Sequence, residues 1–174
     1  MCVLSTLPEQ IGGPGEIVEI DESMLVSRKN NVGRMLGSGW VFGGIQRGDP
    51  SKMFIVLVPD RTAETLLTII RNKIRPGTTI ATDGWASYSS IESMGLEYRH
   101  LTVNHSENFV NPENNLAHTQ NVESMWRWLK RKFKTTTKDS NKRIARLGEF
   151  CYRRVHKDRV FEAILNDIKL TLWA

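Results

Sequence analysis

Residues 53–58, Met-Phe-Ile-Val-Leu-Val, form the longest uninterrupted apolar run of the 174-residue chain, and Pro59 follows directly. The run is short and rich in β-branched residues, which predicts a β-strand. It is far shorter than the roughly 20 residues that span a bilayer. The start of the chain lacks a basic region followed by a long apolar run. We therefore expect neither a transmembrane helix nor a secretory signal.

Further strands are predicted on both sides of this run. Residues 16–22 alternate polar and apolar side chains, residues 40–45 are apolar, and a turn signal occupies residues 48–51. Together with residues 53–58 they predict an antiparallel meander. Apolar residues recur at helical spacing over residues 63–74, with strands predicted at 78–82 and 98–103. A strand, a helix and a strand in this order predict a parallel crossover.

The C-terminal third is predicted to be helical, over residues 120–135, 143–156 and 160–172, and a short helix is predicted around 88–94. Asp60 or Thr62 is expected to cap the helix at 63–74, and Pro76-Gly77 to end it. Gly12-Gly13-Pro14-Gly15 suggests that residues 1–15 are a lead-in and that residues 16–174 form one folded domain. Two cysteines are too few for a disulfide framework or a four-cysteine zinc site.

Positive charge is concentrated towards the C-terminus. The chain has 24 Lys and Arg against 19 Asp and Glu, and residues 127–159 alone hold 13 basic and 3 acidic residues. A basic segment beside an acidic body indicates a polyanionic partner, most often nucleic acid, although a solvated helical face gives the same composition.

Three acidic residues lie at predicted strand ends or at a helix start, and they are candidate ligands for a metal ion. Asp21 lies at the end of the first predicted strand, Asp83 directly follows the fourth, and Glu123 lies in the first turn of the helix at 120–135. Carboxylates that converge repel one another unless a divalent cation such as Mg²⁺ or Mn²⁺ lies between them. Taken singly, each acid also suits a turn, a strand end or a helix N-terminus, so spacing alone is a weak signal.

The amino-acid sequences that flank these acids are a more specific signal than their spacing. Four segments resemble, in order, the motif blocks of Merlin-type DDE transposases and their bacterial ISXO-like insertion-sequence relatives. They are Val-Glu-Ile-Asp-Glu-Ser at 18–23, Pro-Gly-Thr-Thr-Ile-Ala-Thr-Asp-Gly-Trp-Ala-Ser-Tyr at 76–88, Val-Asn-His-Ser-Glu-Asn-Phe-Val at 103–110, and His-Thr-Gln-Asn-Val-Glu-Ser-Met-Trp-Arg-Trp-Leu-Lys at 118–130.

The resemblance implies an α/β, RNase H-like fold: a mixed five-stranded sheet, antiparallel through its first three strands, with flanking helices and extra C-terminal helices. It also implies that Asp21, Asp83 and Glu123 hold two Mg²⁺ or Mn²⁺ ions. Family members carry either Glu or Asn at the third position. We favour Glu123 because Lys130 lies two turns further along the same helix face, and this acid–lysine spacing resembles the family branch that carries Glu. Asn121 is the alternative.

The implied activity is DNA transposition: metal-dependent cleavage of double-stranded DNA at the transposon ends, then strand transfer into a target. The alternatives are a transposase-derived domain that binds DNA or protein without catalysis, and a metal-dependent nuclease of the same fold. The residues expected to contact DNA are Arg127, Lys130, Arg131, Lys132, Lys134, His105 and His118.

Partners and location follow from the same resemblance. We expect a homodimer on DNA, with no small-molecule cofactor and no membrane. The blocks begin near Met1 and no CxxC pair occurs, so we expect no N-terminal DNA-recognition domain and weak sequence specificity. The expected location is the nucleus in a eukaryote, or the cytoplasm and nucleoid in a bacterium.

Overall fold

Strand β1 (Ile17–Met24) lies at the centre of a five-stranded sheet of order β3-β2-β1-β4-β5. It pairs antiparallel with β2 (Trp40–Gln46), which pairs antiparallel with β3 (Met53–Val58). On its other side β1 pairs parallel with β4 (Thr79–Thr82), and β4 pairs parallel with β5 (Arg99–Thr102). The predicted mixed sheet, antiparallel through its first three strands, is confirmed, and its strand order is that of the RNase H-like fold.

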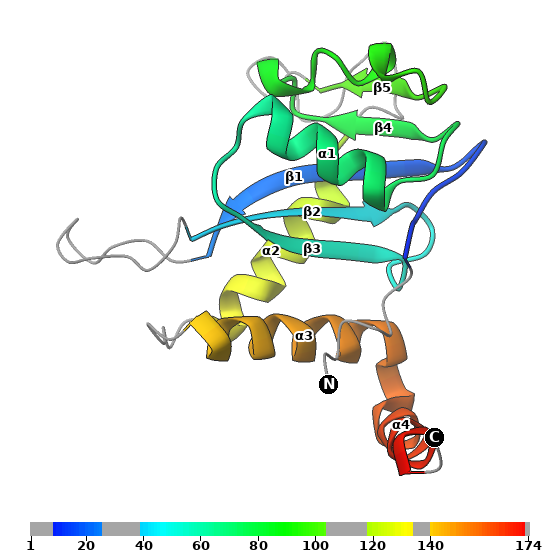
Figure 1. The fold of residues 1–174 in the computed structure, drawn as a ribbon, viewed down its shortest axis with the longest axis vertical. Helices are drawn as coiled ribbons and strands as arrows, with labels where there is room; N and C mark the ends of the chain where they lie inside the picture. The colour runs from blue at the N-terminus through cyan, green and yellow to red at the C-terminus, as the bar shows by residue number, and fades with distance from the viewer. Residues whose placement is uncertain (1–8, 26–38, 104–117, 134–139, 173–174) are drawn as a thin grey trace, which may run out of the picture.

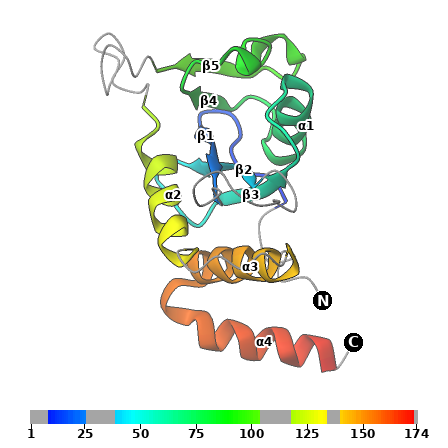
Figure 2. The ribbon, with the colours of Figure 1, turned by 90° about the vertical axis from the view of Figure 1, so that its left-hand side faces the viewer.

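The computed structural model describes residues 9–25, 39–103, 118–133 and 140–172. The motif block at 103–110 lies outside these ranges apart from Val103. One helix covers each face of the sheet, with α1 (Ala63–Lys73) on one side and α2 (Gln120–Lys132) on the other (Figures 1 and 2).

Alternation along β1 divides the core into two clusters. Val18 and Ile20 pack with Leu66 and Ile70 of α1, and all four side chains are fully buried. Opposite, the apolar side chains of α2 pack on those of β2 and β3. Glu19 and Asp21 therefore point towards α2, the face away from Val18 and Ile20, as predicted.

Helix α1 begins where the sequence predicted, and both candidate capping residues contribute. The Thr62 hydroxyl accepts a hydrogen bond from the Thr65 amide at 3.4 Å. The Asp60 carboxylate in turn accepts hydrogen bonds from the Thr62 and Thr65 hydroxyls, each at 2.7 Å. Such caps satisfy amide groups that a first helical turn leaves without partners.

Two more helices follow α2. Helix α3 (Ser140–His156) lies beneath β3, and α4 (Val160–Leu172) runs below α3, away from the sheet (Figures 1 and 2). The single short helix predicted around 88–94 is instead two 3₁₀ turns, η3 (Ala86–Tyr88) and η4 (Glu92–Met94). The second turn ends at Gly95, whose φ of 71° is left-handed and breaks helical geometry.

The described part of the lead-in packs onto the folded body. Ile11 is 1% exposed and forms a parallel bridge with Ile74. The Gly13 amide donates a hydrogen bond of 2.8 Å to the Thr78 hydroxyl, and Gly12 approaches the same side chain so closely that a Cβ would lie 2.5 Å from Thr78 Oγ1. Residues 11–13 thus join the end of α1 to the start of β4.

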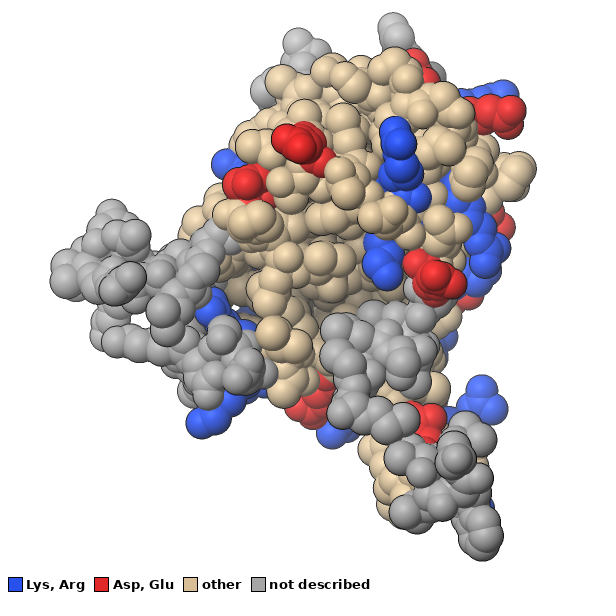
Figure 3. All heavy atoms as spheres, viewed as in Figure 1, with Lys and Arg blue, Asp and Glu red and all other residues tan. Residues whose placement is uncertain are grey.

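The surface seen from the α1 side shows mixed charges. Lys and Arg side chains lie among Asp and Glu, and much of the surface carries neither (Figure 3). Within the described residues, none of the helices combines the length and the apolar character that a membrane crossing requires.

Candidate active site at the ends of strands β1 and β4

The parallel register of β1 and β4 brings two aspartates to the same level. The last pair between the two strands is Glu19 with Ala81, so Asp21 and Asp83 each lie two residues beyond it. Neighbouring strands lie about 4.8 Å apart, and the negative charge of Asp83 acts directly on Asp21. The predicted convergence of these two acids therefore has a structural basis in the crossover from β1 to β4.

The surroundings of Asp21 disfavour the charged form of its carboxyl group. Burial, the largest cause, together with the nearby carboxylates of Glu22 and Asp83, raises its pKa from 3.8 to about 7. Hydrogen bonds oppose this shift: the Glu22 amide donates to Asp21 Oδ1 at 2.7 Å, and Trp126 Nε1 donates to Oδ2 at 3.0 Å. Such a buried carboxylate, beside a second one, is stabilised in its charged form by a cation.

Gly43 makes room for the indole that contacts Asp21. It is the β2 residue paired with Asp21. A Cβ at Gly43 would lie 2.6 Å from Trp126 Cη2 and 3.0 Å from Met125 Cε. The absence of a side chain there lets Trp126 lie against the sheet and reach Asp21 Oδ2.

A tight turn orients Asp83. The Trp85 amide donates to Asp83 Oδ1 at 3.1 Å, and Gly84 between them has a φ of 78°, which glycine adopts without strain. The Arg61 guanidinium lies 3.9 Å from the ring centroids of both Trp40 and Trp85. This cation–π stack joins the loop after β3 and the start of β2 to the turn that carries Asp83.

A third carboxyl group, that of Glu22, lies beside the pair. Glu22 is buried, and this burial raises its pKa, as does the Asp83 charge, whereas the Arg61 charge lowers it. It points to the α1 side of β1, where Tyr88 is fully buried. Its Oε1 accepts no hydrogen bond from the described residues. Sequence reasoning did not select Glu22, although it directly follows Asp21.

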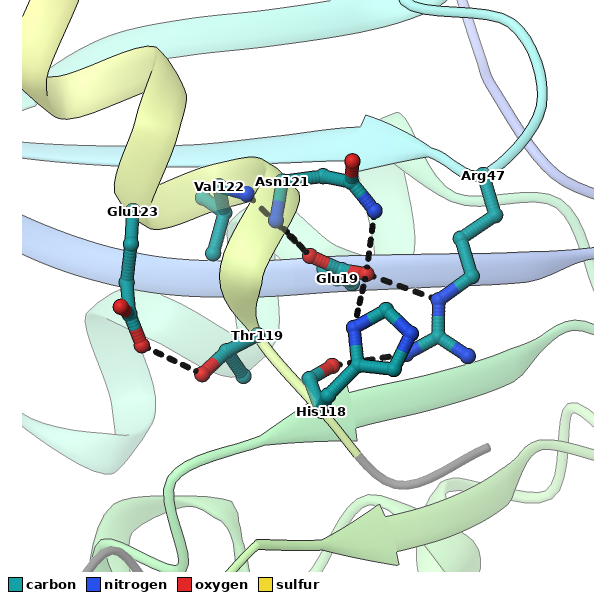
Figure 4. Close-up of polar contacts among 7 residues, drawn as sticks. All are labelled: Glu19, Arg47, His118, Thr119, Asn121, Val122 and Glu123. Carbon is teal, nitrogen blue, oxygen red and sulfur yellow. Dashed lines mark hydrogen bonds and ion pairs between the residues drawn. The ribbon is translucent and has the colours of Figure 1, made fainter. Parts of the chain in front are cut away.

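The start of α2 is anchored to β1 through Glu19 (Figure 4). This carboxylate is completely buried and accepts hydrogen bonds from the backbone amides of Asn121 at 2.8 Å and Val122 at 3.2 Å. Arg47 Nε donates to its Oε1 at 2.7 Å, and His118 Nδ1 lies 3.2 Å from the same atom. A negative charge at a helix N-terminus is favourable, because the first amides point towards it.

Glu19 also bears on the third acidic position. The Asn121 side chain donates through Nδ2 to Glu19 Oε1 at 2.8 Å, so this amide is engaged in anchoring the helix. Glu123 lies on a different side of the helix, exposed, and its Oε1 accepts a hydrogen bond of 2.9 Å from the Thr119 hydroxyl (Figure 4).

The three predicted acids do not form one ready cluster. Among the described residues, no group of three or more His, Cys, Asp or Glu side chains is arranged to hold a metal ion. Asp21 and Asp83 are brought together, whereas Glu123 is not grouped with them. The Asp21–Asp83 pair nevertheless suits a hard divalent cation, because its donors are carboxylate oxygens and a bound cation would favour the charged form of Asp21.

The residues predicted to contact DNA divide into three groups. Four are exposed on α2, where they form a basic outer surface: Arg127, Lys130, Arg131 and Lys132. His118 instead lies against Glu19, and its carbonyl oxygen accepts a 2.7 Å hydrogen bond from Arg47 Nη2. His105 and Lys134 lie outside the described residues.

Several contributors were missed by sequence reasoning. Glu19 was placed on the Asp21 face, but its partner Arg47 lies 28 residues away and no local pattern connects them. Arg61 was likewise not selected, since Trp40 begins strand β2 whereas Trp85 lies in the turn after β4. Of the two tryptophans in α2, Trp126 is 4% exposed whereas Trp128 is 54% exposed.

The strand order β3-β2-β1-β4-β5 is that of the RNase H-like fold, and Asp21 and Asp83 lie at the ends of its central strands. A family model described as the ISXO2-like transposase domain matches residues 13–154. The chain therefore belongs to this DDE transposase family, as its motif blocks indicated.

Two individual proteins are also similar to parts of the chain. Over 80 residues the chain is 32% identical to an "Uncharacterized transposase-like protein" of Haemophilus influenzae, a match covering 46% of this chain and 61% of that protein. A solved structure titled "CryoEM structure of simian T-cell lymphotropic virus intasome in complex with PP2A regulatory subunit B56 gamma" aligns with 85% of this chain and 52% of its own, at 18% identity and a TM-score of 0.48. The chain thus spans between half and two thirds of these relatives.

Proposed function

We propose that this domain cleaves DNA and transfers the cleaved strand into a target, with Asp21, Asp83 and Glu123 as its catalytic acids. The observation that carries the proposal is the partly buried Asp21 carboxyl group, which lies at the end of β1 beside the Trp126 indole and close enough to Asp83 for its charge to raise the Asp21 pKa. Membership of the ISXO2-like transposase family supports the same assignment.

The proposed reaction has two displacements at phosphorus. In the first, the oxygen of water bonds to a phosphorus atom and the bond to the 3′-oxygen breaks, leaving a 5′-phosphate and a free 3′-hydroxyl. In the second, that 3′-hydroxyl oxygen bonds to a phosphorus of the target strand and displaces a second 3′-oxygen. Each attacking group loses one proton and each leaving oxygen gains one, so no external oxidant or reductant is needed.

Divalent ions, when bound, activate the attacking oxygen and stabilise the leaving one. Asp21 and Asp83 would hold them, because both lie at the strand ends and supply carboxylate oxygens. Trp126 orients Asp21 through one carboxylate oxygen, and the Trp85 amide orients Asp83. These contacts preorganise the two ligands before any ion binds.

Glu123 is proposed as the third acid. The Glu19 anchor fixes the N-terminus of α2 beside β1, and Glu123 lies in the first turn of this helix. Its side chain would exchange the Thr119 hydroxyl for the bound ion. Asn121 suits this role less well, since its amide is already bonded to Glu19.

The test uses a labelled duplex with a free 3′-hydroxyl and a supercoiled plasmid in Mn²⁺. Wild-type protein is expected to nick the plasmid and join the duplex to it. Asp83→Asn should abolish both products while keeping DNA binding, and Glu123→Gln should do the same. Glu162→Gln, which changes an exposed acid on α4, is the matched control and should retain both.

Other results of this assay would indicate a different function or a different third residue. Nicking without joining would indicate a metal-dependent nuclease of the same fold. DNA binding without either product would indicate a transposase-derived binding domain. Loss of activity in Asn121→Ala but not in Glu123→Gln would transfer the third role to Asn121.

A further inference from the structure

A groove between α2 and α3 is separate from the acidic site. Its volume is about 430 Å³, within the range of sites that hold small organic groups. Trp128 lies five residues beyond Glu123 on α2, which is about 140° around the helix. The groove therefore opens on another side of α2 from the proposed third acid. Its lining contains two aromatic rings and four cations: Trp128, Phe150, Lys132, Arg146, Arg153 and Arg154.

The charges of the groove favour an anion. Against its four cations stands one lining carboxylate, Glu149, which already forms a 2.8 Å ion pair with Arg153. Arg154 is half-buried, and its Nε–H has no hydrogen-bond partner among the described residues. A buried donor without a partner is costly, so an oxygen ligand at this point would be stabilising.

Trp128 adds a flat stacking surface. Its side chain is 54% exposed, in contrast to the buried apolar residues of the same helix. The Arg131 guanidinium lies 5.3 Å from its ring centroid, which holds the ring in place and adds a further cation beside the groove. An exposed indole among arginines is the combination that binds unpaired nucleotides, because bases stack on the ring and phosphates pair with the cations.

We propose that the α2–α3 groove binds an unpaired DNA strand, with a base stacked on Trp128 and phosphates held by Lys132 and Arg154. The inference rests on the proposed function in taking DNA as the substrate, but it requires no catalysis. A duplex fits the groove less well, since its bases are already stacked on one another. An acidic protein would satisfy the cations but would leave the exposed face of Trp128 without a specific partner.

The experiment measures fluorescence anisotropy of a labelled oligothymidylate in EDTA, so that the acidic site holds no ion. Trp128→Ala should weaken binding about 5- to 150-fold, the effect of losing one stacked base, and Trp128→Phe should restore most of it. Phe161→Ala is the matched control: this aromatic residue is 73% exposed on α4, outside the groove, and its loss should change nothing.

A second pair of variants tests the phosphate contacts. Lys132→Gln should reduce the slope of log affinity against log salt by about 0.7, whereas Lys169→Gln, an exposed lysine of α4, should leave the slope unchanged. Urea unfolding of each variant confirms that the fold is intact.

Three results would overturn the inference. The first is unchanged oligothymidylate affinity in a folded Trp128→Ala protein. The second is loss of that affinity in Asp83→Asn, which would locate binding at the acidic site. The third is a shift from dimer to monomer in Trp128→Ala at unchanged affinity, which would make the groove an interface between two copies. Binding that depends on Trp128 in a protein without cleavage activity would sustain the inference while the proposed function failed.

Discussion

Replacing Glu19 by Gln tests whether a buried carboxylate fixes helix α2 to the central strand. The substitution keeps the size of the side chain but removes its charge. It leaves Arg47, whose side chain is 15% exposed, without its carboxylate partner. It also removes the negative charge that the amides of Asn121 and Val122 point towards.

The expected cost is large because the pair is buried. Removing one partner of a buried ion pair costs about 3–5 kcal/mol. Domains of this size are stable by only about 5–15 kcal/mol. A urea midpoint lower by about 1–3 M is therefore expected, at an m-value typical of a domain of this size.

An exposed pair of the same chemistry provides the control. Arg153 Nε lies 2.8 Å from Glu149 Oε1, almost the same separation as the 2.7 Å between Arg47 Nε and Glu19 Oε1, but both partners are 58% exposed. Glu149→Gln should cost only about 0.3–0.5 kcal/mol. Equal losses in the two variants would refute the reasoning, since burial would then contribute nothing to the strength of the pair.

Four further outcomes are expected. Without metal, Asp21 keeps its proton in the folded chain up to about pH 7 but loses it in the unfolded chain above its ordinary pKa of 3.8. The free energy of unfolding therefore falls between these two pH values as the pH rises, by on the order of 1 kcal/mol per pH unit. Urea unfolding across pH should show that Asp21→Asn abolishes this slope. Trp126→Phe removes the hydrogen bond to Asp21 Oδ2, so the slope should extend to higher pH in the same experiment, and an unmoved upper end would contradict this role. Gly43→Ala adds a Cβ 2.6 Å from Trp126 Cη2, and calorimetry should record a loss of about 1–3 kcal/mol; unchanged stability would mean that the indole has room to shift. Arg61→Lys loses the planar stack on Trp85 and should cost about 1 kcal/mol with a change in tryptophan fluorescence, and an unchanged spectrum would count against the stack.

Most of the secondary structure could be predicted because its signals are local. The β-branched run at 53–58 became β3, and the helical spacing from Ala63 became α1, with bounds within a residue or two of those expected. The prediction of a short helix around 88–94 was wrong, since the structure has two 3₁₀ turns at 86–94. Short segments carry too few periodic positions to separate these two geometries.

The candidate site was predicted in part. Asp21 and Asp83 were selected as strand-end acids, and each lies two residues beyond the last β1–β4 pair; their catalytic role stays a prediction. Glu19 and Arg47 could not be paired in advance, because buried ion pairs depend on which distant segments meet. The raised pKa of Asp21 could not be predicted from the sequence either, because its main cause is the burial of the side chain in the folded protein.

The amino-acid sequence by itself determined the order of strands and helices, the basic C-terminal third and the membership of a transposase family. The periodicity of apolar residues, the turn residues and the motif sequences are all properties of neighbouring residues, so they can be recognised without coordinates. Only the tertiary structure decided that Glu19 anchors α2, that Trp126 reaches Asp21, and that Trp128 opens onto a basic groove. Each of these contacts joins residues that are distant in sequence or lie on different helices, and their energies depend on burial and geometry that exist only after the chain has folded.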